Sequence, residues 1–184
     1  SDFRVKQGKK LDRLLTQTLA VLMKQGVLQL KRVAHDGMKV RAHAGAGSFK
    51  RKSSLERAHM EAEQQVRRLK RELTDDPGAG NRRVQAAKER AARARQSAIE
   101  AALAELPELE EKQAQRAKAN GERAKGKQVR VSTTDAECRV MKMADGGFRP
   151  AYNVQLATDV GTGCIVGVDV TNNGTDQPHV VPML

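Results

Sequence analysis

A charged, alanine-rich stretch over residues 53–128 constrains the fold of this chain most strongly. Ser53-Ser54-Leu55-Glu56 has the pattern of a capping box, so a helix is expected to begin there. Apolar or half-polar residues then recur every seven positions in two series: Leu55, Ala62 and Leu69, and His59, Val66 and Leu73. This spacing predicts a seam of the coiled-coil type. The run 75–81 contains Pro77 and two glycines and predicts the end of the helix.

The second half of this stretch predicts another helix that returns along the first. Its expected seam is made mostly of alanine and consists of Val84, Ala87, Ala91, Ala94, Ala98 and Ala102. Small side chains suit close helix approach, so an antiparallel helical hairpin is expected. Pro107 predicts a kink or break, and the polar run from Lys112 to Lys127 predicts frayed helix or linker.

The start of the chain predicts a helix followed by a strand. Five leucines lie at helical spacing within residues 9–25, and Gly26 is the expected C-cap: Leu11, Leu14, Leu15, Leu19 and Leu22. We expect these leucines to lie in a core or an interface. Residues 28–40 alternate apolar and polar positions, which predicts a strand with Asp36 in it or at its end. A glycine-rich loop is expected over residues 42–48.

The last third of the chain predicts two strands joined by a tight turn. The strands are expected at residues 149–159 and 164–171, on either side of Gly161-Thr162-Gly163, with Val166, Val168 and Val170 on one face. A further helix is expected to begin near Asp176. Four parts result: an amphipathic helical segment (1–26), a first strand with a basic loop (27–52), a helical hairpin insertion with linker (53–128), and two strands with the start of a helix (129–184).

The charge of the chain points to an acidic partner. The formal net charge is +12, and residues 1–52 hold 13 Lys and Arg against 3 Asp and Glu, a balance of +10. Such a field attracts polyanions. No apolar run reaches the ~20 residues that a spanning helix needs, and no signal-peptide pattern is present, so we expect a soluble, cytoplasmic protein with no membrane partner. Only 2% of the residues are aromatic, which argues against a base-stacking platform.

Several ordered blocks of sequence resemble the DDE-class transposases of bacterial insertion sequences. The blocks are Val33–Val40, Arg139–Lys142, Tyr152–Gln155, Asp169–Asn172 and Val181–Leu184. The resemblance implies an α+β fold: a partial ribonuclease-H-like mixed sheet, interrupted by the long antiparallel helical hairpin. It also implies that the chain is one piece of a DNA transposase, and that the complete protein is a homo-oligomer acting on double-stranded DNA, both transposon ends and target.

The same resemblance assigns one catalytic residue. Asp36 matches the family's first catalytic Asp and would be a metal ligand, although Met38 stands where the family usually has a small hydroxylated residue. Cleaving and rejoining DNA requires two divalent ions, Mg²⁺ or Mn²⁺, held by several carboxylates. The resemblance places the second Asp and the Glu beyond Leu184. Asp169 matches a position without a catalytic role, and Asp176 is interpreted as a helix cap.

Two alternatives remain open for the basic residues and for the function. Five cations follow Asp36 and are candidates for contacts to DNA phosphates: Lys39, Arg41, Lys50, Arg51 and Lys52. Solvated surface charge is the rival interpretation for each of them. Without the resemblance, Asp36 alone would be interpreted as a turn or capping residue. The second functional hypothesis is a non-enzymatic, basic coiled-coil protein that binds nucleic acid or mediates assembly.

Overall fold

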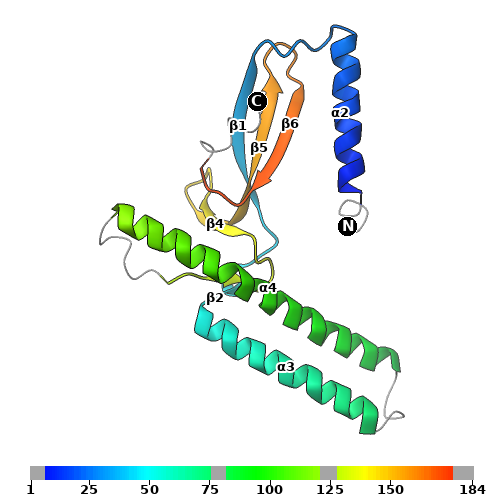
Figure 1. Ribbon diagram of the computed structural model, residues 1–184, viewed down its shortest axis with the longest axis vertical. Coiled ribbons are helices and arrows are strands. Elements are labelled where there is room, and N and C mark those ends of the chain that lie inside the picture. The colour runs from blue at the N-terminus through cyan, green and yellow to red at the C-terminus, as the bar shows by residue number, and fades with distance from the viewer. Residues whose placement is uncertain (1–6, 76–81, 121–127, 176–184) are drawn as a thin grey trace. The chain divides into compact units, whose positions relative to one another are not determined.

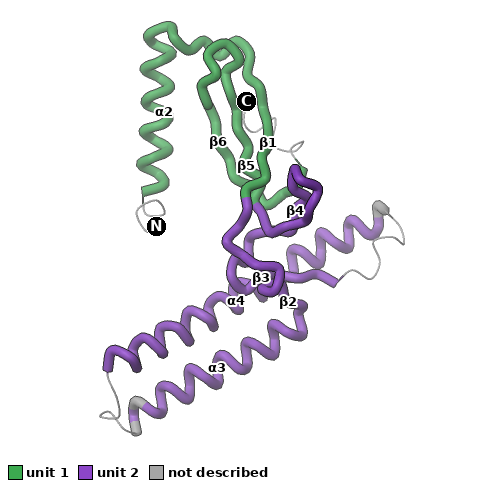
Figure 2. Tube along the Cα trace, turned by 180° about the vertical axis from the view of Figure 1, so that it is seen from behind, with its two compact units in different colours: residues 1–40, 152–184 green, residues 41–151 purple. Residues whose placement is uncertain are grey.

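The computed structural model describes residues 7–75, 82–120 and 128–175 and has a mixed α+β architecture with antiparallel sheets (Figure 1). The chain divides into two compact units (Figure 2). The first unit combines residues 1–40 and 152–184, and the second unit comprises residues 41–151.

The first unit begins with helix α2, Gly8–Lys24. Its end is set by Gly26, which has φ +72° and donates its N–H to Met23 O, while Val27 donates to Leu22 O. This pair of bonds is the Schellman motif, which confirms the predicted glycine C-cap. None of the described residues of α2 is buried, and Leu14 is 57% exposed. The leucine stripe is therefore available to a partner and does not form a core.

A three-stranded antiparallel arrangement forms the rest of the first unit. The long strand β5 (Phe148–Asp159) lies between β1 (Val33–Arg41) and β6 (Ile165–Thr171), as Figure 1 shows. Val160 N–H donates to Arg32 O at one end of the β1–β5 pairing. The β5–β6 register places Val154 opposite Val170 and Gln155 opposite Asp169. These strands confirm the predicted pair at 149–159 and 164–171.

The turn between β5 and β6 follows from two local features. Asp159 Oδ2 accepts hydrogen bonds from the Thr162 backbone N–H at 3.0 Å and from its hydroxyl at 2.7 Å. Gly163 has φ +72°, a conformation that other residues adopt at a cost. The sequence 159–163 therefore specifies the hairpin turn locally.

The second unit is built on a helical hairpin. Helices α3 (Lys52–Asp75) and α4 (Arg82–Asn120) lie side by side and antiparallel (Figure 1). Their main core consists of Leu55, Ala62, Ile99, Ala102, Leu106 and Val131. A smaller cluster further along contains Val66, Leu69 and Ala92. The predicted α3 seam is confirmed at Leu55, Ala62, Val66 and Leu69, whereas the side chain of Leu73 lies outside the described residues.

Three short strands complete the second unit. Strands β2 (Phe49–Lys50) and β3 (Val131–Ser132) pair antiparallel, with Phe49 opposite Ser132 and Lys50 opposite Val131. Strand β4 (Arg139–Lys142) pairs with the first residues of β5. The β2–β3 pair closes the open end of the hairpin, and Val131 contributes to its core. The sequence patterns predicted none of these three strands.

The alanine seam that we expected on α4 is confirmed only at its C-terminal end, where Ala98 is half-buried and Ala102 is buried. Val84 is 50% exposed, and Ala87, Ala91 and Ala94 are exposed, while the buried positions are Ala92, Ile99, Ala102 and Leu106. Alanines occur on every side of this helix, so their spacing alone cannot choose a face. The larger apolar side chains of Ile99 and Leu106 gain more free energy from burial, and they decide which face turns toward α3.

Three other expectations about the elements need correction. Helix α3 begins at Lys52, one residue early, so Ser53 is inside the helix and is not its cap. Helix α4 continues through Pro107, where we had expected a kink or break. It ends at Asn120, so part of the segment expected to be frayed helix or linker is regular helix. The pairings among the described strands are antiparallel, so the expected mixed sheet is not seen there. The helix expected from Asp176 lies outside the described residues.

No helix in the described parts of the chain combines the length and the apolar character needed to cross a membrane.

Candidate functional site

Asp36 lies in the middle of β1 and its side chain is exposed. Its Oδ1 accepts a hydrogen bond of 2.9 Å from the backbone N–H of Gly37. The sequence left open whether Asp36 lies in the strand or at its end, and the structure places it inside the nine-residue strand, as its fourth residue. A carboxylate at this position is held by regular strand geometry and does not cap a turn.

The two faces of the sheet in the first unit differ in character. Residues 32 and 160 are opposite each other, so even-numbered positions of β1, β5 and β6 share one face. That face carries Asp36 together with mostly apolar residues: Met38, Val40, Val154, Leu156, Val168 and Val170. The opposite face carries His35, Lys39, Asn153, Gln155, Asp159 and Asp169. Among the described residues of these three strands, Asp36 is thus the one carboxylate on a largely apolar face.

Asp169 does not substitute for a second catalytic carboxylate beside Asp36. It lies opposite Gln155 in β6, on the other face of the sheet. In the parts of the chain that the structure describes, no three His, Cys, Asp or Glu side chains form a group able to hold a metal ion. One carboxylate does not hold two divalent ions. The described residues therefore do not fit a two-metal centre by themselves, and we derive no metal-dependent step from them.

The five predicted DNA-binding residues do not gather in one place. Lys39 is in the first unit, on the face opposite Asp36, and Arg41 is an exposed residue at the end of β1. Lys50 is on β2 and lines a recess on the helical hairpin. Arg51 and Lys52 line a different recess, of about 470 Å³. The basic segment is therefore divided among several surfaces.

Among the described residues that line it, the recess with Arg51 and Lys52 has no net charge to attract an anion. Glu56 and Glu110 also line it, so two cations face two carboxylates. Its remaining lining groups are neutral, among them Gln113 and Gln128. For Arg51 and Lys52 the structure thus favours the interpretation as locally balanced surface charge.

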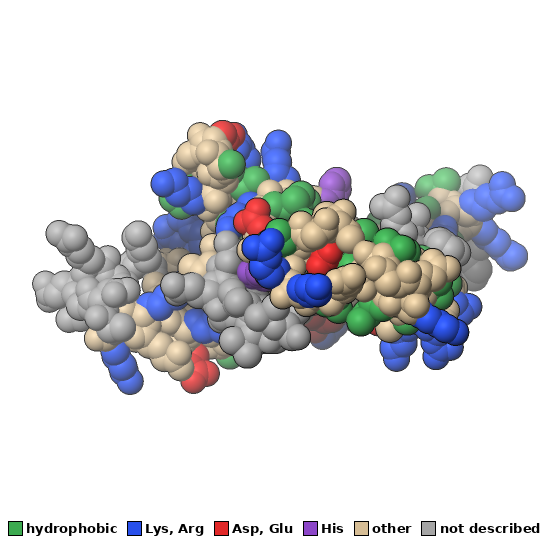
Figure 3. All heavy atoms as spheres, turned by 90° about the horizontal axis from the view of Figure 1, so that it is seen from above, with side chains coloured by type: hydrophobic (Ala, Val, Ile, Leu, Met, Phe, Trp, Pro, Cys, Tyr) green, Lys and Arg blue, Asp and Glu red, His purple; other side chains and the backbone are tan. Residues whose placement is uncertain are grey.

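Many basic side chains of the hairpin are balanced by acids one helical turn away. The pairs Arg67–Glu63, Arg68–Glu72, Arg93–Glu89 and Lys112–Glu108 each join residues four positions apart. Ion pairs of this kind on a helix surface contribute little to the stability of the helix. On the face shown in Figure 3, Lys and Arg side chains are spread out and do not form one patch. At these four pairs, the basic charge is balanced within the helix.

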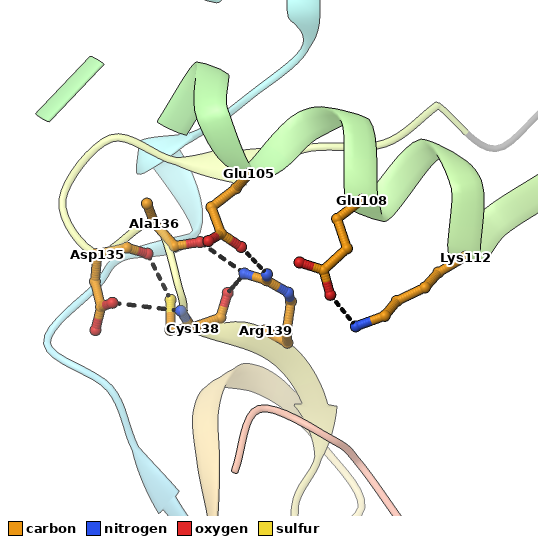
Figure 4. Close-up of polar contacts among 7 residues, drawn as sticks. All are labelled: Glu105, Glu108, Lys112, Asp135, Ala136, Cys138 and Arg139. Carbon is orange, nitrogen blue, oxygen red and sulfur yellow. Dashed lines mark hydrogen bonds and ion pairs between the residues drawn. The ribbon is translucent and has the colours of Figure 1, made fainter. Parts of the chain in front are cut away.

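One ion pair of the second unit is half-buried. The Arg139 guanidinium contacts the Glu105 carboxylate and also donates to Ala136 O at 2.6 Å and to Cys138 O at 3.0 Å (Figure 4). The Arg139 and Glu105 side chains are 17% and 26% exposed. This contact joins β4 to α4. The sequence did not identify it, because the partners are 34 positions apart.

Cys138 is enclosed beside this ion pair. Its thiol donates to Asp135 O at 3.2 Å, and its backbone N–H donates to the Asp135 carboxylate at 3.3 Å. Burial, with the negative charge of Asp135, raises the pKa of the Cys138 thiol to about 11. A protonated, enclosed thiol is a poor nucleophile. Cys138 is therefore a packing residue, and both cysteines are free.

The histidines have structural surroundings. His59 on α3 is half-buried, and its Nε2 lies 3.3 Å from Glu100 Oε1 on α4, which makes a polar contact across the hairpin. His43 is exposed. The buried Nε2 of His35 has no hydrogen-bond partner among the described residues. None of these surroundings gives a described histidine a metal-binding neighbour set.

Comparisons of the chain with protein-family models, with curated proteins and with solved structures found no match.

Proposed function

We propose that this chain is part of a DNA transposase of the DDE class, in which Asp36 is the first of the metal-binding carboxylates. The observation that carries the proposal is the position of Asp36 in the middle of β1, beside the long antiparallel pair β5–β6. The family resemblance expects an Asp on a first strand followed by such a hairpin. The strand order β1-β5-β6 agrees with that expectation.

The free edge of β1 supports the same proposal. Among the described strands, β1 pairs with β5 alone, so its other edge has backbone groups available to a further strand. The resemblance expects the second Asp and the Glu on later elements. In a complete enzyme they would supply the additional ligands that two Mg²⁺ or Mn²⁺ ions need, and those ions would stabilise the attacking and leaving oxygens of the phosphodiester.

The test of the proposal is to assay strand cleavage with the chain in its complete reading frame. We expect Asp36→Asn to reduce Mg²⁺-dependent cleavage of transposon-end DNA by ~10³-fold or more, because a metal ligand is lost. The matched control is Asp169→Asn, which removes a strand carboxylate from the other face and should leave cleavage within about threefold of the wild type. Equal activity of wild type and Asp36→Asn would exclude the catalytic role of Asp36.

The chain of 184 residues is expected to bind DNA without cutting it. Its single family carboxylate cannot hold two metal ions, so we expect no cleavage with Mg²⁺ or Mn²⁺. Cleavage by the purified chain that depends on Asp36 would contradict this. The coding sequence after Leu184 gives an independent test: a strand with an Asp and a later helix with a Glu support the proposal, and a stop codon directly there contradicts it.

One observation favours the second candidate, a non-enzymatic assembly or nucleic-acid-binding protein. The leucine stripe of α2 is exposed, with Leu11 45% and Leu14 57% accessible. An amphipathic helix with an uncovered apolar face suits helix pairing between copies. This surface also suits the homo-oligomer expected for a transposase, so cleavage activity, and not the oligomeric state, separates the two candidates.

A further inference from the structure

A recess on the helical hairpin gathers three basic side chains from three different elements. Lys50 comes from β2, Arg57 from α3 and Arg95 from α4, and all three line one cavity of about 520 Å³. The side chains of all three are exposed and therefore hydrated and charged. The elements that carry them belong to the second unit, so the recess is built within one compact part of the chain.

The charge of this recess is not balanced, unlike that of its neighbours on the hairpin. Among the described residues of its lining, Glu61 alone is acidic, which leaves three cations against one carboxylate, a balance of +2. Glu61 is four positions from Arg57 on α3, yet in the described structure no ion pair joins them. No ion pair to Lys50 or Arg95 is found among the described residues either. Elsewhere on the same helices the acids at this spacing do pair.

Small side chains create the hollow, and short strands hold its wall in place. Ala58 and Ala98 line the cavity above the buried Ile99, where larger residues would fill it. The wall residue Thr133 is held by its backbone N–H, which donates to Ser48 O at 3.1 Å. Lys50 is fixed in register opposite the buried Val131. The recess is thus shaped by the packed core of the hairpin and does not depend on a ligand.

We propose that this recess binds a phosphodiester group of the DNA backbone. Guanidinium groups match phosphate oxygens with paired hydrogen bonds, and Lys50 adds a point charge. The hydroxyls of Ser54 and Thr133 in the same lining are further donors. The inference rests on the proposed function for the identity of the polyanion as DNA. In this proposal the helical hairpin binds DNA directly, through a phosphate-binding site formed by α3, α4 and β2.

Four variants of the whole chain test this site by fluorescence anisotropy with a labelled DNA duplex. Arg57→Gln with Arg95→Gln removes two recess cations, and Arg71→Gln with Arg116→Gln is the matched control, which removes two exposed cations elsewhere on the same helices. Glu61→Gln removes the opposing charge. Ala98→Leu fills the hollow without changing any charge. Thermal unfolding checks that each variant folds.

We expect the recess double variant to bind DNA about tenfold more weakly and to lower the salt slope by about 2, because each phosphate contact contributes about 0.9 to that slope. The control double variant should change affinity by less than about threefold. Glu61→Gln should tighten binding by about threefold, and Ala98→Leu should weaken it. Because Glu61→Gln has the opposite sign and removes no basic group, misfolding cannot imitate its effect.

The other outcomes overturn the inference in distinguishable ways. Equal losses for the recess and control variants, with salt-sensitive binding by the wild type, would contradict the recess and leave the proposed function standing. Absence of DNA binding by the wild type at about 50 mM salt would contradict both. A second titration uses inorganic phosphate alone. If the recess variant loses phosphate binding but keeps its DNA affinity, the ligand is a small phosphate compound, and the assignment to DNA is wrong.

Discussion

At the scale of single residues, burial of the side chain decides how much an ion pair contributes to the stability of this protein. Arg93 is 58% exposed in a pair within one helix, whereas Arg139 is 17% exposed in a pair that joins two elements, and their partners Glu89 and Glu105 are similarly half-buried. A half-buried ion pair has already lost part of its hydration, so removing one partner leaves the other poorly solvated. The same chemistry therefore has different energetic weight at the two sites.

We expect Arg139→Met to lower the free energy of unfolding by about 2 kcal/mol, because Glu105 and two backbone carbonyls lose their donor. A double-mutant cycle with Glu105→Gln, measured by urea unfolding, should give a coupling energy of about 1 kcal/mol. Arg93→Met is the control and should cost about 0.5 kcal/mol or less. Equal costs for the two arginines would show that Arg139 is no better enclosed than a surface residue.

Cys138 makes stability depend on alkaline pH. Its pKa is raised from 9.0 to about 11 in the folded chain, so the unfolded thiol loses its proton first. The stabilisation is fully present below about pH 9 and is lost as pH rises toward 11. Urea unfolding should show this loss in the wild type and a smaller one in Cys138→Ala. Iodoacetamide at pH 8 should modify Cys164 and leave Cys138 intact until the chain unfolds. Rapid alkylation of native Cys138 would contradict its enclosure.

At the scale of elements, the hairpin is specified by a few large side chains on otherwise permissive helices. Leu55, Ile99 and Leu106 are at most 3% exposed and form the contact between α3 and α4. Alanine favours the helix on all sides of α4 without choosing a face. Pro107 is accommodated inside α4, although it lacks the N–H for one backbone bond, because Leu106 beside it is buried in the core.

The choice of face on α4 can be tested with two truncations. Ile99→Ala should lower the free energy of unfolding by about 2–4 kcal/mol, because it leaves a cavity in the core of the hairpin. Val84→Ala, at a position that the alanine spacing had placed in the seam, should cost about 0.5 kcal/mol or less because Val84 is 50% exposed. Chemical denaturation of both variants measures the difference. A larger loss of unfolding free energy for Val84→Ala than for Ile99→Ala would support the seam that the alanine spacing predicted.

At the scale of the whole molecule, the chain divides into two compact units. The second unit has a continuous apolar core between α3, α4 and β3. In the first unit, Met38, Val168 and Val170 are all more than half exposed on one face of the sheet. Less apolar burial gives less stabilisation, so the first unit should be the weaker of the two.

We therefore expect two unfolding transitions in calorimetry, with the first unit melting earlier. Leu55→Ala should lower only the later transition, by the cost of a core cavity. Gly163→Val should lower only the earlier one, because a β-branched residue at φ +72° strains the turn between β5 and β6. A single transition that both variants lower equally would contradict independent units.

The local patterns of the sequence determined the elements whose signals lie within a few residues. The leucine period with Gly26 predicted α2, and the turn at 161–163 predicted the β5–β6 pair, since capping and turn geometry depend on neighbours in the chain. Which strand carries Asp36 was predicted for the same reason. The catalytic role given to Asp36 remains a prediction from the resemblance.

Only the tertiary structure decided which residues meet across long separations. The two-residue strands β2 and β3 are too short to have a period, and they pair because the hairpin core brings Val131 to the base of α3. Ile99, and not the alanine spacing, set the buried face of α4. The meeting of Lys50, Arg57 and Arg95 in one recess, and of Arg139 with Glu105, follows from that packing. Sequence periodicity predicts which face of a single helix or strand is buried. These sites depend instead on how two elements pack against each other.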